Sequence, residues 1–111
     1  MRRGKVYFAD IPAGVLEESA VGYRFIYHAE YLKNPKARPI AFSFPLRTEP
    51  FESEKLFPFF EGLIPEGWYL AIAAKTLKAD TEDRFGLLLA TASHTIGAVS
   101  ILPEEMVEGR V

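Results

Sequence analysis

The 111-residue sequence contains no cysteine. This excludes a disulfide framework and thiolate metal sites, and it fits a reducing compartment. No apolar run approaches the roughly 20 residues that a membrane-spanning helix needs. Residues 1–4 lead directly into a strand pattern, without the features of a signal peptide. We therefore expect a cytoplasmic protein that does not associate with a membrane.

The sequence also lacks an excess of positive charge. Its formal net charge is −2 at pH 7, whereas dedicated nucleic-acid-binding domains are usually strongly basic. Basic side chains gather in two stretches, but acidic residues are interspersed along the chain, which favours an ordinary solvated surface. These basic residues are Arg2, Arg3, Lys5, Lys33, Lys36 and Arg38. We expect no direct binding of nucleic acid.

Motifs that carry catalytic chemistry are missing as well. The sequence has no glycine-rich phosphate loop, no H-R-D or D-F-G kinase element and no G-x-S-x-G nucleophile elbow. His28 and His94 have no second ligand at a metal-site spacing. The acidic clusters at 17–18, 49–54 and 80–83 are interpreted as solvated charges and a helix start. The sequence therefore predicts no catalytic residue, no metal site and no cofactor, and it favours a protein that works by binding.

What the sequence has is the composition of one folded domain. Hydrophobic residues make up 49% of it and charged residues 25%, as in globular proteins rather than disordered ones. Its length is close to the usual size of a single domain. We predict one domain over residues 1–103, followed by a short acidic tail over 104–111.

Alternating apolar residues predict five strands. Pro12 and Gly14 indicate a turn between the first two strands, over residues 11–14. Pro39 and Pro45 bracket the fourth strand, as is typical of an edge strand. Val21, Tyr23, Phe25 and Tyr27 share one face of the third strand, and residues 46–53 are predicted to be a loop. The predicted strands are 5–10, 15–18, 21–27, 40–44 and 96–102.

Helical patterns dominate the second half. A single turn over 29–33 precedes a short helix over 56–64, where Pro58 is tolerable only in the first turn. A helix over 68–77 follows, and Asp80 or Thr81 is predicted to cap a third helix. The buried stripe of that third helix comprises Phe85, Leu88, Leu89 and Ala92. The predicted fold class is α+β, a small antiparallel sheet of about five strands covered by three short helices.

Trp68 stands out as the only tryptophan, directly after the turn Pro65-Glu66-Gly67. On an ideal helix it lies about 160° from Leu70, which is in the middle of the apolar stripe, and Ile72 lies on the same outward side as Trp68. An indole beside a rigid turn is a good interface anchor, because tryptophan is enriched among residues that dominate binding energy. Most tryptophans, however, are largely buried in their own domain. The residues alone leave core and interface equally open.

Several motifs, in order, resemble the N-terminal subdomain of HipA-type toxin kinases. The most specific are the run Phe59-Phe60-Glu61-Gly62-Leu63-Ile64-Pro65-Glu66-Gly67 and the closing Gly97-Ala98-Val99. Others are Gly4-Lys5-Val6, Phe25-Ile26-Tyr27 and Pro39-Ile40-Ala41-Phe42-Ser43-Phe44-Pro45-Leu46, followed by Asp83-Arg84-Phe85-Gly86-Leu87-Leu88. The resemblance covers nearly the whole chain. HipA-like kinases continue from this subdomain into a kinase body, whereas this sequence stops at Val111, an arrangement that resembles the stand-alone HipS type of the tripartite HipB–HipS–HipT systems.

The resemblance implies an antitoxin that binds and inhibits a HipT-like serine/threonine kinase. It further implies that a tryptophan enters the kinase active site, a role that only Trp68 can fill here, which favours interface over core. The partner-binding residues that we predict are Trp68, Gly67, Glu66, Pro65, Tyr69 and Ile72. A HipB-like helix-turn-helix DNA-binding protein is the implied further member of a ternary complex. The alternatives are a structural or regulatory subdomain of a longer HipA-like kinase that contacts a HipB-like protein, and a small enzyme with an unseen site.

Overall fold

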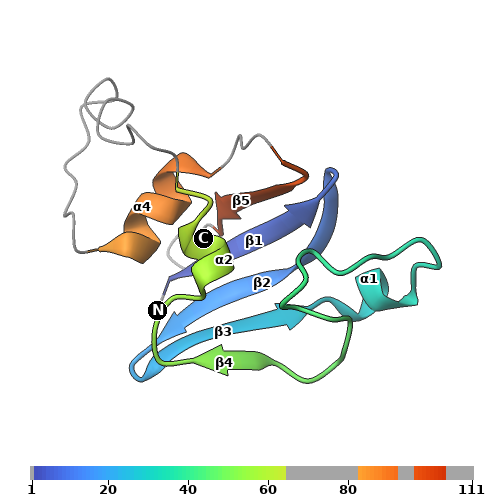
Figure 1. Ribbon diagram of the computed structural model, residues 1–111, viewed down its shortest axis with the longest axis horizontal. Coiled ribbons are helices and arrows are strands. Elements are labelled where there is room, and N and C mark those ends of the chain that lie inside the picture. The colour runs from blue at the N-terminus through green and yellow to red at the C-terminus, as the bar shows by residue number, and fades with distance from the viewer. Residues whose placement is uncertain (1, 65–82, 93–96, 105–111) are drawn as a thin grey trace, which may run out of the picture.

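A computed structural model describes residues 2–64, 83–92 and 97–104 of the chain. Within this part, five strands form one antiparallel sheet in the order β4-β3-β2-β1-β5 (Figure 1). The described part also contains three helices, and the predicted α+β class is confirmed. The strands are β1 (Arg3–Phe8), β2 (Ile11–Ser19), β3 (Gly22–Tyr27), β4 (Phe51–Ser53) and β5 (Val99–Pro103), and the helices are α1 (Ala29–Lys33), α2 (Pro58–Glu61) and α4 (Arg84–Thr91).

The first hairpin turns earlier than predicted. Ala9 and Asp10 both have positive φ values, of 51° and 69°, which is the backbone of a two-residue hairpin loop that matches the twist of its strands. The predicted turn at 11–14 is therefore wrong, and those residues begin β2. Pro12 is accommodated there because the register between β1 and β2 shifts beside it, and such irregularities are where strands tolerate proline.

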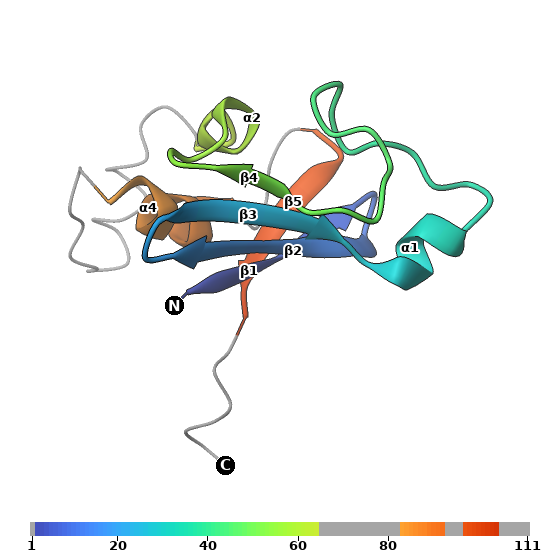
Figure 2. The same cartoon turned by 90° about the horizontal axis from the view of Figure 1, so that it is seen from below.

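The core lies on one face of the sheet. Leu16 on β2 stands opposite Phe25 on β3, and Phe25 stands opposite Phe51 on β4. Helix α2 lies against this face (Figure 2), where it contributes Phe60, while α4 contributes Phe85 and Leu88. Because consecutive strand residues point to opposite faces, one side of each strand is buried and the other is left to solvent. The largest fully buried side chains are Phe25, Phe60, Phe85, Leu16, Leu88, Ile101 and Val6.

The predicted strand over 40–44 is wrong. Ile40 and Phe44 are buried, but this segment bends back on itself, and the Phe44 N–H donates to the carbonyl of Ala41 at 3.0 Å. The apolar residues alternate here because both ends of the segment are buried in the core, although the backbone between them forms a bend and not a strand. The edge strand beside β3 is instead β4, which lies in the predicted loop 46–53.

The remaining predictions in the described part are largely confirmed. Helix α1 is the single turn expected, and Pro58 is the first residue of α2. Helix α4 is capped by Asp83, whereas Asp80 and Thr81 lie outside the described residues. Its buried side includes Leu87 in addition to the predicted stripe, and Leu89 is only partly buried. On β3, Phe25 and Tyr27 are buried as predicted, whereas Val21 lies just before the strand and is 84% exposed.

Candidate partner-binding site

The six residues predicted to bind a partner lie outside the described residues. They are Pro65, Glu66, Gly67, Trp68, Tyr69 and Ile72, and the predicted helix over 68–77 falls in the same stretch. The structure describes what bounds this stretch, which comprises residues 65–82. On one side is the end of α2, and on the other is the start of α4 (Figure 1).

At the end of α2, which precedes residues 65–82, buried side chains anchor the chain to the core. Pro58 starts the helix, where its missing N–H leaves no hydrogen bond unmade. Phe60 is completely buried, and its ring centroid lies 5.6 Å from that of Phe25 in the sheet. The helix ends at Glu61 with Gly62 as its C-cap, and Ile64 returns to the core. The chain therefore leaves the described part of the domain from an anchored position.

At the start of α4, which follows residues 65–82, charged side chains hold the helix in place. The Asp83 carboxylate caps the helix by accepting the Gly86 N–H at 3.1 Å. Arg2 donates to both oxygens of Asp83 at 2.9 Å, and its guanidinium also donates to both carboxylate oxygens of Glu18. The ring of Phe85 lies 5.4 Å below the same guanidinium. Arg2 thus ties the start of α4 to the first two strands, a pairing that sequence reasoning missed because it treated these charges as solvated.

This cluster perturbs the ionisation of its members. Hydrogen bonds from Arg2 lower the pKa of Glu18 and of Asp83 below their ordinary values, and the same bonds raise the pKa of Arg2. All three side chains are partly exposed to solvent, so water weakens each pair. The arrangement is suited to holding a helix start in place, and it offers no pair of carboxylates with separated acid and base roles.

A second ion pair joins the two boundaries directly. Arg84 Nε on α4 lies 3.2 Å from Glu61 Oε2 on α2. The last residue of α2 and the first residue of α4 are therefore neighbours, although 22 residues separate them in sequence. We refer to this arrangement of α2, α4, Arg2, Glu61 and Asp83 as the frame. It brings Glu61, which precedes residues 65–82 in the sequence, close to Arg84, which follows them.

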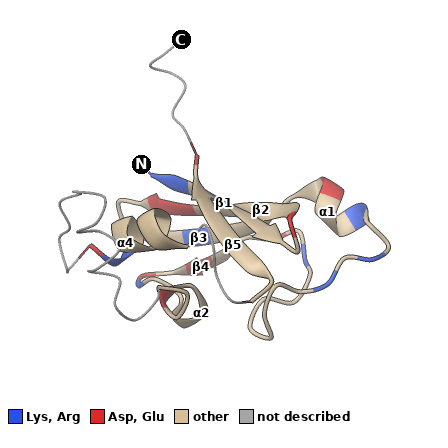
Figure 3. Ribbon diagram, turned by 90° about the horizontal axis from the view of Figure 1, so that it is seen from above, with Lys and Arg blue, Asp and Glu red and all other residues tan. Residues whose placement is uncertain are grey.

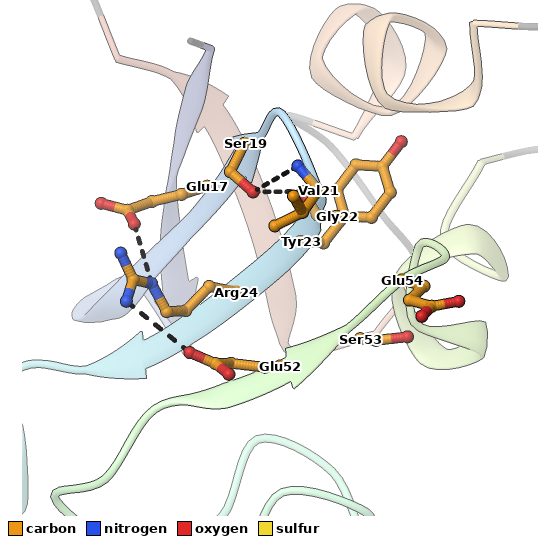
Figure 4. Close-up of a pocket in the computed structure, with 9 residues that line it drawn as sticks. All are labelled: Glu17, Ser19, Val21, Gly22, Tyr23, Arg24, Glu52, Ser53 and Glu54. Atoms are coloured by element: carbon orange, nitrogen blue, oxygen red, sulfur yellow. Dashed lines mark hydrogen bonds and ion pairs between the residues drawn. The ribbon is translucent and has the colours of Figure 1, made fainter.

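The described part also has a polar cleft of about 600 Å³, shown in Figure 4. Glu17, Arg24 and Glu52 point toward one another across its strands, with Arg24 3.4 Å from Glu17 and 3.7 Å from Glu52. Ser19 Oγ donates to the Gly22 carbonyl and accepts the Val21 N–H, so it serves the hairpin turn. The carboxylates are paired with arginine and the hydroxyl is engaged in the turn, an arrangement typical of structural contacts rather than catalysis.

A second cleft, of about 570 Å³, lies beside α1. It is lined by Ile11, Pro12, Tyr31 and His28, and His28 is the residue that precedes the helix. His94 lies outside the described residues. Among the residues that the structure describes, no group of three His, Asp or Glu side chains is placed to hold a metal ion. In the same residues, no helix is long and apolar enough to cross a membrane.

Comparisons with known proteins identify a family and a solved structure with this architecture. A family model described as the HipA N-terminal domain matches residues 4–102. A solved structure described as the N-terminal domain of HipA toxin superposes with a TM-score of 0.67 and 33% sequence identity, covering 96% of this chain and 95% of that one.

Two curated proteins are similar in sequence. An uncharacterised protein of Haemophilus influenzae is 36% identical over 105 residues, which is 95% of this chain and 95% of that protein. A putative kinase of Sinorhizobium fredii, Y4mE, is 33% identical over 81 residues, which is 73% of this chain but 19% of the kinase. The same domain therefore matches one protein of similar length and a small part of a much longer one.

Proposed function

The chain belongs to the HipA N-terminal domain family, and on that basis we propose that it binds and restrains a HipT-like serine/threonine kinase, as a HipS-type antitoxin does. Binding would occupy space at or near the kinase active site, without chemistry of its own. Support comes from the Haemophilus influenzae relative, which is matched over 95% of its length. A domain of this family thus occurs in a protein of about this size.

The observation that carries the proposal is the frame around residues 65–82. The Glu61–Arg84 pair and the Arg2–Asp83 pair hold the boundaries of this stretch, and both boundaries rest on the core through Phe60 and Phe85. A rigid base lowers the entropy lost when a presented side chain binds. In our proposal Trp68 is the central anchor, with Pro65, Glu66, Gly67, Tyr69 and Ile72 around it. A HipB-like DNA-binding protein would complete a ternary complex.

A growth assay tests this function in cells. The chain and a HipT-like kinase are expressed from separate inducible promoters, and colony formation is counted with and without each. We expect the kinase alone to stop growth and the wild-type chain to restore it. Trp68→Ala should fail to restore growth while accumulating to the same level, since it removes the anchor. Full rescue by Trp68→Ala would show that inhibition does not depend on the tryptophan. Failure of the wild-type chain to rescue growth would overturn the antitoxin role.

One observation favours a second function. The match to the putative kinase Y4mE covers only 19% of that protein, so a domain of this kind also occurs within a longer chain. In that setting it would act as a structural or regulatory subdomain that packs against its own kinase body and contacts a HipB-like protein. The reading frame distinguishes the two. A reading frame that continues into a kinase supports this second function, whereas a stop codon with a kinase gene beside it supports the first.

A further inference from the structure

Phe42 is fully exposed, with a relative accessibility of 105%, in a domain whose other phenylalanines are buried or partly buried. It lies at the apex of the bend formed by residues 40–44. Both ends of this bend meet at one hydroxyl group: Tyr27 Oη accepts the Ile40 N–H at 3.0 Å and donates to the Phe44 carbonyl. The apex residue is therefore held away from the core by fixed neighbours on both sides.

The base of this bend is held by ring stacking and hydrogen bonds. Tyr27 is buried, and its ring stacks on that of Tyr31 with centroids 5.8 Å apart. The Tyr31 hydroxyl donates to the Arg38 carbonyl at 2.7 Å and accepts the Arg38 N–H at 3.2 Å. Two tyrosine hydroxyls thus fix the backbone at Arg38, Ile40 and Phe44. An aromatic side chain on a fixed backbone loses little freedom on binding, which is the property of an interface anchor.

The sequence segment that contains Phe42 is basic. From residue 31 to residue 48 the sequence contains four basic residues and no acidic one, in a chain whose net charge is −2. Helix α1 carries acidic Glu30 in its first turn and basic Lys33 in its last turn, and Figure 3 shows basic residues along the segment that follows the helix. The ion pairs among the described residues involve Arg2, Arg3, Arg24 and Arg84. None of them involves Lys33, Lys36 or Arg38, whose charges remain available to a partner.

We propose that Phe42, Lys33, Lys36 and Arg38 form an interaction surface, the Phe42 surface, that docks on an acidic face of the partner kinase with Phe42 in an apolar pocket. The partner is the kinase of the proposed function, on which this inference rests. A protein fits better than a nucleic acid because the exposed residues of the same segment include the aliphatic Leu46, four positions after Phe42 and 37% exposed. Single-stranded nucleic acids are instead bound by several aromatic side chains in a basic groove.

The test compares matched substitutions by isothermal titration calorimetry against the HipT-like kinase that the growth assay uses. Phe42→Ser removes the anchor, and Val21→Ser is its control, because Val21 is also highly exposed, at 84%, but lies on the β2–β3 turn away from the basic segment. The triple variant Lys33→Glu, Lys36→Glu and Arg38→Glu reverses the charge. Circular dichroism checks that each variant is folded, which exposed positions should allow. In a parallel titration, a fluorescent 20-nucleotide single-stranded DNA replaces the kinase.

We expect Phe42→Ser to weaken kinase binding at least about tenfold, as for an interface anchor, and Val21→Ser to leave it within about twofold. The triple variant should bind more weakly, and its affinity should depend less on salt than that of wild type. If wild type binds the kinase but Phe42→Ser binds equally well, the Phe42 surface is overturned while the proposed function stands. If wild type does not bind the kinase, both fail. DNA binding that requires Phe42 and the three cations would also overturn the protein-docking proposal.

Discussion

The hydroxyl group of Tyr27 donates a hydrogen bond to the backbone carbonyl of Phe44, and the same oxygen accepts the N–H of Ile40. Burial raises the pKa of this hydroxyl, so it stays protonated and able to donate at neutral pH. One side chain on β3 thereby satisfies two backbone groups of a bend 13 and 17 residues further along. This contact determines the path of residues 40–44 and the exposure of Phe42.

Tyr27→Phe is expected to destabilise the domain by about 1–3 kcal/mol, because it leaves a buried carbonyl and N–H without their partner. Urea unfolding followed by circular dichroism measures the free energy of unfolding. Tyr23→Phe is the matched control: Tyr23 contacts Phe85 through its ring, with centroids 5.8 Å apart, and that contact survives loss of the hydroxyl. Equal stabilities of the two variants would contradict the role given to the Tyr27 hydroxyl.

Gly22→Ala should destabilise the hairpin between β2 and β3. Gly22 has a φ of +154°, which side chains rarely adopt, and an added Cβ would collide with the Ser53 carbonyl of β4. We expect a loss of roughly 1–3 kcal/mol in the free energy of unfolding. Gly97→Ala is the control, since an added Cβ there meets nothing within 4 Å. A Gly22→Ala variant as stable as Gly97→Ala would contradict this prediction, because it would mean that β3 and β4 move apart around the added Cβ without loss of stability.

Stability should fall in acid through the Arg2 cluster. Arg2 holds the pKa of Glu18 and Asp83 below their ordinary values of 4.5 and 3.8. A carboxylate with a lowered pKa stabilises the fold above its unfolded-state pKa, and that contribution is lost as the pH falls through the folded-state pKa. Arg2→Met should therefore cost on the order of 1 kcal/mol at pH 7, a modest value because the pairs are partly exposed. The difference from wild type should begin to shrink below about pH 4.5.

The measurement is the free energy of unfolding of wild type and Arg2→Met at pH 7, 5, 4 and 3. Lys36→Met is a suitable control, because Lys36 takes part in none of the ion pairs among the described residues. It should match wild type at each pH. A cost for Arg2→Met that is the same at pH 7 and pH 3 would mean that Arg2 acts through its packing on Phe85 rather than through the two carboxylates.

Much of the fold could be predicted from local patterns. The alternation in β3, the position of Pro58 and the apolar stripe of α4 each follow from the spacing of side chains on one element. The prediction failed where a distant group decided the outcome. Apolar residues alternate over 40–44 as they do in a strand, but the Tyr27 hydroxyl forms hydrogen bonds with the backbone at both ends of this segment. The three-residue strand β4 is recognisable only through its pairing with β3.

The candidate site was only partly accessible from the sequence. Asp83 resembles many acidic residues at a helix start, and nothing local indicates that Arg2, 81 positions away, binds it. Phe42 alternates with Ile40 and Phe44 as a strand residue does, so the sequence does not predict its exposure. The six predicted partner-binding residues rest on family resemblance, and their role remains a prediction.

The most direct test of the account is inhibition of the purified partner kinase by the purified chain. Autophosphorylation with labelled ATP is measured while wild type, Trp68→Phe or Trp68→Ala is titrated into a fixed amount of kinase. We predict inhibition by wild type, weaker inhibition by Trp68→Phe, and a loss of at least about tenfold in potency for a folded Trp68→Ala, as for a binding hot spot. Inhibition by Trp68→Ala equal to that by wild type, or no inhibition by wild type, would contradict the central claim.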